Sequence, residues 1–240
     1  MATTQAFQYA LITPARNEEA FIERTVKAVV SQTVLPQIWV IVNDGSSDRT
    51  AEIAGHYASQ YDFIRLIHIS RNGERDFGAK AFAFQYGYDY LRGTSCAFVG
   101  NLDADVEFET TYFERLLQAF DNDPRLGLAG GIIFEYDGRE FIRQNTGLSS
   151  VAGAVQLFRR RCYEEIGGYV PLELGGIDTV VEVLARKHGW KVQTFPELRV
   201  MHHRRVAREE RRNLAGQISP GVDALHAWLS SFVSIPPLHA

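Results

Sequence analysis

Residues 96–108, CAFVGNLDADVEF, join a short apolar run to two carboxylates separated by a single alanine. The apolar run predicts a buried strand that ends near Asn101. Asp103 and Asp105 follow, and carboxylates this close repel each other unless a cation or a proton lies between them. An Asp-x-Asp pair can share a hard divalent cation, for which oxygen ligands suit Mg²⁺ or Mn²⁺. The alternative is that Asp105 or a neighbour only caps a following helix.

Outward from this stretch, short apolar runs alternate with segments whose apolar residues recur at helical spacing. Strands are predicted at 9–13, 38–44, 63–69 and 96–102, and helices near 18–31, 49–59, 77–91 and 112–121. This alternation predicts an α/β fold with a mostly parallel, doubly wound sheet and helices on both faces.

Polar residues gather just after the predicted strands, at 14–18, 44–48 and 103–105. Right-handed crossovers bring the carboxyl ends of parallel strands to one edge of the sheet, where open α/β sheets bind their ligands. The sequence therefore predicts a ligand site at that edge.

The second half of the chain, from about residue 135, alternates less regularly. A strand and a short helix are expected within 151–170, a helix at 178–190, and extended segments at 191–195 and 198–204. We interpret this half as a smaller region that covers the sheet.

Composition excludes several classes of protein. The 240 residues are 45% hydrophobic and 22% charged, as in ordinary globular proteins. A net charge of −4 disfavours a nucleic-acid partner. Two cysteines without metal-type spacing favour a reducing compartment. No secretory signal is visible and no stretch approaches the ~20 apolar residues of a membrane span. The apolar tail at 225–240 leaves open peripheral contact with a membrane or a partner.

Three motifs at successive strand ends, PARNEE (14–19), VNDGSSD (42–48) and GNLDAD (100–105), together resemble family 2 glycosyltransferases of the GT-A fold. The segments VAGAVQLFRRRCYEEIGGY, GGIDTVVEVLARKHGW and VMHHR are similar to a bacterial polysaccharide-biosynthesis branch of that family. The resemblance covers about residues 9–205. It implies a GT-A, Rossmann-like sheet with a smaller acceptor-side region toward the C-terminus.

The resemblance implies residues for a nucleoside-diphosphate sugar. Pro14, Arg16 and Glu18 match the first donor segment, with Glu18 as an acceptor for ribose hydroxyls. Asp44 matches a base-binding position, although it could only close the turn with Gly45. Two further residues complete the implied set. Lys80 matches a position facing the diphosphate, with a plain surface role as the alternative, and Asp103 lies against ribose and metal.

Metal binding is implied for Asp105 directly, for Asp103, and for one histidine of VMHHR. Adjacent side chains of an extended segment point to opposite faces, so only one of His202 and His203 can reach the site. We choose His202 from the family pattern. Two surface histidines among arginines are the alternative.

The family carries its catalytic base at the position of Asp178, where an inverting transfer needs a carboxylate to deprotonate the acceptor hydroxyl. Many members have Glu-Asp there, whereas this chain has Ile177-Asp178. The competing interpretation makes Asp178 only the N-cap of a helix at 178–188. Arg159–Arg161 face either the diphosphate, a phosphorylated lipid acceptor, or solvent.

The resulting hypothesis is a cytoplasmic, metal-dependent, inverting glycosyltransferase of the hexosyltransferase type, which uses a UDP- or GDP-linked sugar and Mg²⁺ or Mn²⁺. Its acceptor would be a saccharide or lipid-linked saccharide in surface or exopolysaccharide assembly, with the inner face of the cell membrane left open as its location. Residues 1–135 would bind the nucleotide sugar, 136–206 the acceptor, and 207–240 would form an extension.

Two alternatives come from other classes. A haloacid dehalogenase-type phosphatase also has an Asp-x-Asp loop, but that loop normally follows its first core strand. A degenerate module could bind nucleotide sugars without transferring them. Nucleotidyltransferases and dinucleotide oxidoreductases need glycines after the first strand, and TPARNEE has none.

Overall fold

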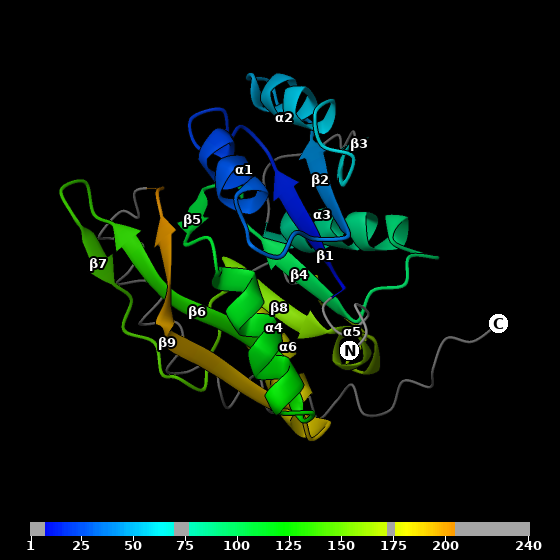
Figure 1. The fold of residues 1–240 in the computed structure, drawn as a ribbon, viewed down its shortest axis with the longest axis vertical. Coiled ribbons are helices and arrows are strands. Elements are labelled where there is room, and N and C mark those ends of the chain that lie inside the picture. Colours follow the sequence, from blue (N-terminus) through cyan, green and yellow to red (C-terminus); the bar gives the residue numbers. More distant parts are fainter. Residues whose placement is uncertain (1–7, 70–76, 172–175, 205–240) are drawn as a thin grey trace.

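The computed structural model describes residues 8–69, 77–171 and 176–204. Its elements form a single mixed sheet flanked by helices (Figure 1). Four parallel strands from the first half lie in the order β3-β2-β1-β4. They are β1 (Tyr9–Ala15), β2 (Ile38–Asp44), β3 (Ile64–Ile69) and β4 (Phe98–Leu102). The predicted parallel strands and their crossover helices are confirmed.

The second half extends the same sheet beyond β4. Strand β8 (Val155–Arg159) pairs antiparallel to β4, and the order continues β8-β6-β9-β5. The remaining strands are β5 (Val106–Phe108), β6 (Leu126–Tyr136), β7 (Phe141–Arg143), which pairs with β6, and β9 (Lys191–His202). The two extended segments predicted at 191–195 and 198–204 are one strand, β9, whose register against β6 shifts between Gly131 and Ile132.

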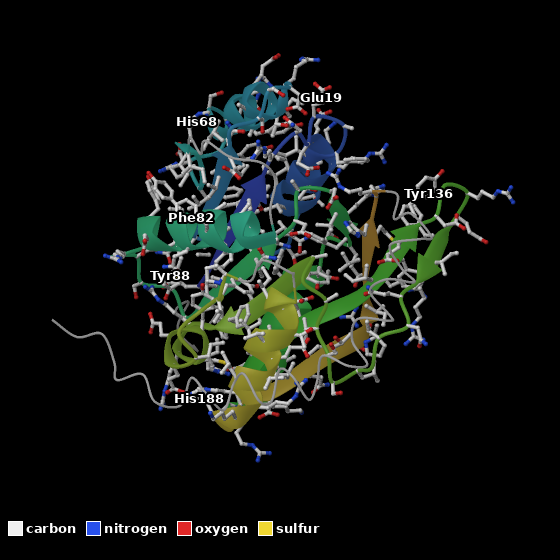
Figure 2. All side chains as sticks on the ribbon, turned by 180° about the vertical axis from the view of Figure 1, so that it is seen from behind. Glu19, His68, Phe82, Tyr88, Tyr136 and His188 are labelled. Atoms are coloured by element: carbon white, nitrogen blue, oxygen red, sulfur yellow. The ribbon has the colours of Figure 1, made fainter. Side chains whose placement is uncertain are left out.

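Helices cover both faces, as predicted, because alternate strand residues are apolar on both sides. On one face, α1 (Ile22–Val30), α2 (Thr50–Ala58) and α4 (Tyr112–Asn122) share an apolar cluster with strand residues that include Leu11 and Ile41. On the other, α3 (Phe77–Tyr90), α5 (Arg160–Glu165) and α6 (Ile177–Lys187) share a second apolar cluster with strand residues that include Ile12 and Val99. Figure 2 shows this second face, with Phe82 and Tyr88 on α3.

The described helices are all too short or too polar to cross a bilayer. The predicted extension at 207–240 lies outside the described residues.

Candidate active site

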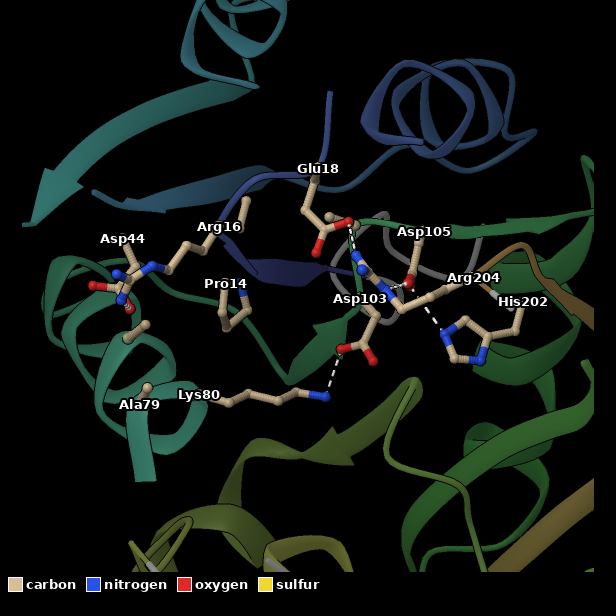
Figure 3. Close-up of a pocket in the computed structure, with 13 residues that line it drawn as sticks. Pro14, Arg16, Glu18, Asp44, Ala79, Lys80, Asp103, Asp105, His202 and Arg204 are labelled. Carbon is tan, nitrogen blue, oxygen red and sulfur yellow. Dashed lines mark hydrogen bonds and ion pairs between the residues drawn. The ribbon is translucent and has the colours of Figure 1, made fainter. Parts of the chain in front are cut away.

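A cavity of about 270 Å³ opens at the carboxyl edge of the parallel strands (Figure 3). All the residues that the sequence assigned to nucleotide sugar and metal line it, whereas Asp178 does not. Its lining is Pro14, Ala15, Arg16, Glu18, Asp44, Ala79, Lys80, Ala83, Asp103, Ala104, Asp105, His202 and Arg204. Segments far apart in the sequence thus meet where the topology predicts a ligand site.

The loop after β1 is held by hydrogen bonds to the loop after β2. Asn17 adopts a left-handed conformation with φ 55°, which asparagine tolerates better than most residues. Its Oδ1 accepts from the backbone N–H of Ser47 at 2.9 Å. The N–H of Glu18 donates to Thr50 Oγ1 at 2.7 Å. These contacts fix the backbone on both sides of Arg16 and Glu18.

Asp44 is the last residue of β2 and is buried at the cavity wall. Arg16 Nη1 lies 3.9 Å from Asp44 Oδ2, the outer limit of an ion pair. Pro14 lies beside Val42 in the parallel pairing of β1 and β2, and it has no N–H to offer the neighbouring strand. Asp44 therefore presents a carboxylate in a pocket with an apolar ring nearby, a setting that suits a base N–H.

Asp103 and Lys80 form an ion pair across the cavity, with Lys80 Nζ 2.5 Å from Asp103 Oδ1. Lys80 Nζ also donates to the carbonyl of Gly153 at 3.2 Å. Burial raises the pKa of Asp103, as does the charge of Asp105, while Lys80 opposes both. A cation near Asp103 would relieve this repulsion.

Asp105 is nearly buried, and each of its oxygens has a separate partner. Oδ1 lies 3.2 Å from His202 Nε2, and Oδ2 accepts from Arg204 Nε at 2.9 Å. Burial alone would raise the pKa of Asp105, but His202 and Arg204 outweigh it and lower that pKa to about 2. For His202, burial lowers the pKa, but Asp105 raises it overall. Asp105 is therefore a carboxylate at neutral pH.

The pairing of β5 with β9 brings His202 to Asp105. Val106 pairs with His202 in the antiparallel register, directly beside Asp105. The next residue, His203, points elsewhere, since its Nε2 lies 2.9 Å from Glu107 Oε2. Of the two histidines, the structure thus places His202 in the cavity.

Asp103, Asp105 and His202 could hold a metal ion together. One ligand atom from each lies within 4.8 Å of the others. Two carboxylates and an imidazole fit Mn²⁺ or Mg²⁺ in ligand chemistry. The capping alternative for Asp105 does not hold, because β5 follows it and α4 begins at Tyr112 after Thr111.

Asp178 lies beside Gly153, whose carbonyl accepts from Lys80 Nζ. A Cβ at Gly153 would approach Asp178 Oδ2 to 3.2 Å, so glycine leaves room for this carboxylate. The N-cap of α6 is Gly176, so Asp178 is the second helical residue and not the predicted cap. Ile177, the departure from the family pattern, packs against the apolar cluster beneath.

Tyr169 is buried, and its hydroxyl donates to Gln156 Oε1. Burial raises the pKa of its phenol, and the charges of both Asp178 and Asp103 add to the effect. Asp178 is only partly buried, which leaves it accessible to an acceptor.

The arginines at 159–161 are used structurally and none lines the cavity. Arg159 donates to the carbonyls of Leu126 and Phe120, at 3.1 and 2.8 Å. Arg160 and Arg161 pair with Glu164 and Glu165 one helical turn on. Of the alternatives for these arginines, the one that places them in the cavity beside a diphosphate is therefore not supported by the structure.

Sequence reasoning missed Arg204, which lines the cavity, and the buried Asn101, which lies beside Gly153 and does not line it. Arg204 pairs with both Glu18 and Asp105. Since residues two apart in an extended segment share a face, the assignment of His202 could have indicated Arg204 as well. Asn101 was noted only as a strand end. Its Nδ2 donates to the Gly153 carbonyl at 2.6 Å, and its buried Oδ1 has no partner among the described residues.

The family model described as "Glycosyl transferase family 2" matches residues 10–177, well over half of the chain. The chain belongs to glycosyltransferase family 2. This agrees with the resemblance described above, and Asp103 and Asp105 lie within the matched residues. The match does not support the phosphatase alternative.

Among curated relatives, the chain is 34% identical over 112 residues to the uncharacterized glycosyltransferase EpsJ of Bacillus subtilis, covering 45% of this chain and 29% of EpsJ. It is 32% identical over 117 residues to the poly-β-1,6-N-acetyl-D-glucosamine synthase of Staphylococcus aureus, covering 48% of this chain and 26% of the synthase. The chain therefore corresponds to less than a third of either relative's length.

The fold is that of GT-A glycosyltransferases. The mannosyltransferase PcManGT from Pyrobaculum calidifontis, solved with GDP-Man and Mn²⁺, superposes with a TM-score of 0.62 at 19% identity. The superposition covers 81% of this chain and 56% of PcManGT. At this identity the comparison shows the fold and not the donor.

Proposed function

We propose that this family 2 glycosyltransferase is a metal-dependent, inverting hexosyltransferase that uses a UDP- or GDP-linked sugar. The observation that carries the proposal is the meeting of Asp103, Asp105 and His202 with Glu18 and Asp44 in one cavity. Metal-type ligands and nucleoside-type acceptors in one space suit a donor whose diphosphate lies between them.

Different residues of the cavity would bind different parts of the donor. Asp44 would accept a base N–H beside Pro14, and Glu18 would accept from ribose hydroxyls. Lys80 and Arg16 would offer positive charge to the diphosphate. Asp103, Asp105 and His202 would hold Mg²⁺ or Mn²⁺, which supplies positive charge to the leaving nucleoside diphosphate. The two carboxylates fit this role because their own repulsion is relieved by the ion.

Asp178 would be the general base. Its carboxylate accepts the proton of the acceptor hydroxyl while that oxygen forms a bond to the anomeric carbon. The bond from that carbon to the diphosphate oxygen breaks, and the nucleoside diphosphate leaves with the electron pair. Attack from behind the leaving group inverts the anomeric configuration.

The acceptor would be a saccharide or lipid-linked saccharide in surface or exopolysaccharide assembly. The similarity to the staphylococcal poly-β-1,6-N-acetyl-D-glucosamine synthase supports this process. We assign the reaction to the cytoplasmic side, where nucleotide sugars are made, with peripheral membrane contact as the means of reaching lipid-linked acceptors.

A thermal-shift screen of UDP, GDP and their sugars, with and without Mn²⁺, tests the donor assignment. We expect one nucleoside diphosphate to raise the melting temperature, and Mn²⁺ to enlarge the increase. No shift with any nucleotide in the presence of Mn²⁺ would contradict the proposal.

Donor hydrolysis separates an enzyme from a degenerate binding module. An active transferase releases nucleoside diphosphate slowly with water and faster with an acceptor. A protein that binds the donor tightly but releases no nucleoside diphosphate with any acceptor would favour the binding module.

A further inference from the structure

His202, the last residue of β9, and the two residues that follow it all contact Asp105. His202 Nε2 lies 3.2 Å from Oδ1, the N–H of His203 donates to the Asp105 carbonyl at 2.9 Å, and Arg204 Nε donates to Oδ2 at 2.9 Å. The main-chain bond fixes where the two side chains leave the strand. One carboxylate is therefore held in place from both of its oxygens.

Arg204 also reaches the other wall of the cavity. Its Nη2 pairs with Glu18 Oε2, and its guanidinium lies over the ring of Phe21, 5.5 Å from the centroid. Figure 3 shows the arginine lying between the two carboxylates. Glu18 belongs to the loop after β1 and Asp105 to the loop after β4, so a single side chain joins these two loops.

The burial of the two carboxylates makes their contacts with Arg204 energetically more important than ion pairs on the surface. The side chains of Glu18 and Asp105 are 9% and 6% exposed, and that of Arg204 is 37% exposed. Ion pairs on exposed surfaces contribute little, but a nearly buried carboxylate depends on its partner. Moving Arg204 would leave two buried carboxylates without that partner.

We propose that Arg204 is a positioning residue that couples the metal-side carboxylate Asp105 to the nucleoside-side carboxylate Glu18. This inference rests on the proposed function. Arg204 Nε holds Oδ2, which leaves Oδ1 turned toward His202 and Asp103. Nη2 holds Glu18 at the same time, so the orientation of each carboxylate depends on the other.

Lysine cannot replace this arrangement, although it keeps the charge. A guanidinium offers separate donors in fixed directions, whereas an ammonium is a single point. Residues that orient metal ligands typically change metal affinity by about 10- to 100-fold. We therefore expect R204K to weaken binding of Mn²⁺ alone by about 10-fold.

The first experiment measures the affinity for Mn²⁺ alone, from the electron paramagnetic resonance signal of the free ion. The second measures the affinities for UDP and GDP by calorimetry in the absence of metal. The proteins are wild type, R204K, E18Q and the double variant. The matched control is R161K, because Arg161 pairs with Glu165 on the surface at 2.7 Å. We expect R161K to bind Mn²⁺ as wild type does.

Glu18 does not belong to the group that could hold the metal, so E18Q distinguishes positioning from charge. If Glu18 affects Mn²⁺ affinity only by positioning Arg204, then E18Q changes that affinity in the wild-type protein but not in R204K. If instead the loss of the Glu18 charge changes Mn²⁺ affinity directly, E18Q has the same effect in the wild-type protein and in R204K. Equal effects of E18Q in both backgrounds, or wild-type Mn²⁺ affinity in R204K, would overturn the inference.

The same data keep the two proposals apart. If the wild-type protein binds Mn²⁺ and a nucleoside diphosphate, and R204K binds Mn²⁺ equally well, only the proposed role of Arg204 is contradicted. A wild-type protein that binds neither overturns the proposed function and this inference together.

Discussion

At the residue scale, the two acids of the Asp-x-Asp pair occupy different environments. Asp103 faces Lys80 and has a raised pKa, whereas Asp105 is held by His202 and Arg204 and has a pKa lowered to about 2. Neutralising one acid should therefore differ in effect from neutralising the other. Asp105 is the stronger candidate for a permanently charged ligand.

Asp105→Asn should abolish sugar transfer and weaken Mn²⁺-dependent nucleotide binding by about 100-fold, because the neutral amide lacks the negative charge with which a carboxylate binds a divalent cation. Calorimetry with Mn²⁺ present and absent measures the difference. The matched control is Glu107→Gln, which neutralises the half-exposed acid two residues on that pairs with His203. Equal losses in the two variants would argue against a metal role for Asp105.

Asp178→Asn should lower kcat by about 10²- to 10⁴-fold, the usual contribution of a general base. Donor binding should stay near the wild-type value, because Asp178 does not line the cavity that we propose for the donor. Steady-state kinetics and calorimetry on the same preparation measure both quantities. A parallel loss of transfer and donor binding would instead indicate a structural role at the start of α6.

At the element scale, β9 links the site to the rest of the sheet. It runs parallel to β6, with a register shift opposite Gly131, and then pairs antiparallel to β5. The Gly131 N–H donates to the hydroxyl of Tyr112 at 2.8 Å, which ties the irregularity to α4. The position of His202 therefore depends on packing far from the cavity.

Gly131→Ala should destabilise the protein by about 3 kcal/mol, because over-packing a filled core forces the backbone apart. A Cβ there would lie 2.3 Å from the Leu198 carbonyl oxygen and 2.9 Å from the Tyr112 ring. Urea unfolding followed by circular dichroism measures the change.

Gly147→Ala is the control for this substitution, since its nearest neighbour would lie 3.8 Å away. We expect it to unfold at nearly the wild-type urea concentration. A Gly131→Ala protein as stable as Gly147→Ala would show that β6 and β9 separate at little cost.

Strand ends in the first half could be predicted because each parallel strand, its crossover helix and its polar terminus are contiguous in sequence. Because of that locality, the order of the chain alone is enough to assign Pro14, Asp44 and Asp103 to one edge. The second half depends on pairings between distant segments, such as β4 with β8, which periodicity does not encode. The bridge from Arg204 to Glu18 depends on a side-chain conformation, so only its face of the strand could have been foreseen.

At the scale of the whole molecule, both cysteines lie in the core. Cys96 is 7% exposed and Cys162 is fully buried. Burial raises the pKa of Cys96, and it raises that of Cys162 to about 12. The folded protein therefore favours the neutral thiols. As the pH rises above the ordinary thiol pKa toward 12, ionisation of the thiols in the unfolded chain lowers the free energy of unfolding.

Thiol labelling at pH 8.5 should give little reaction in the native protein and two thiols in guanidinium chloride. An unfolded thiol is about half ionised at that pH, whereas burial favours the protonated form of both thiols in the folded protein and raises the pKa of Cys162 to about 12. Absorbance of the released aryl thiolate follows the reaction. Rapid native labelling would show that the core opens readily at one of these sites.

The join between β4 and β8 has a consequence for how the molecule comes apart. Asp103 and Asp105 follow β4 in the parallel half, while His202 ends β9 in the half that β8 attaches. A cation bound by all three would span this seam, and the halves could not separate without releasing it. Its affinity would then add to the resistance against heat, and stripping it would loosen the sheet at the place where the two halves were joined.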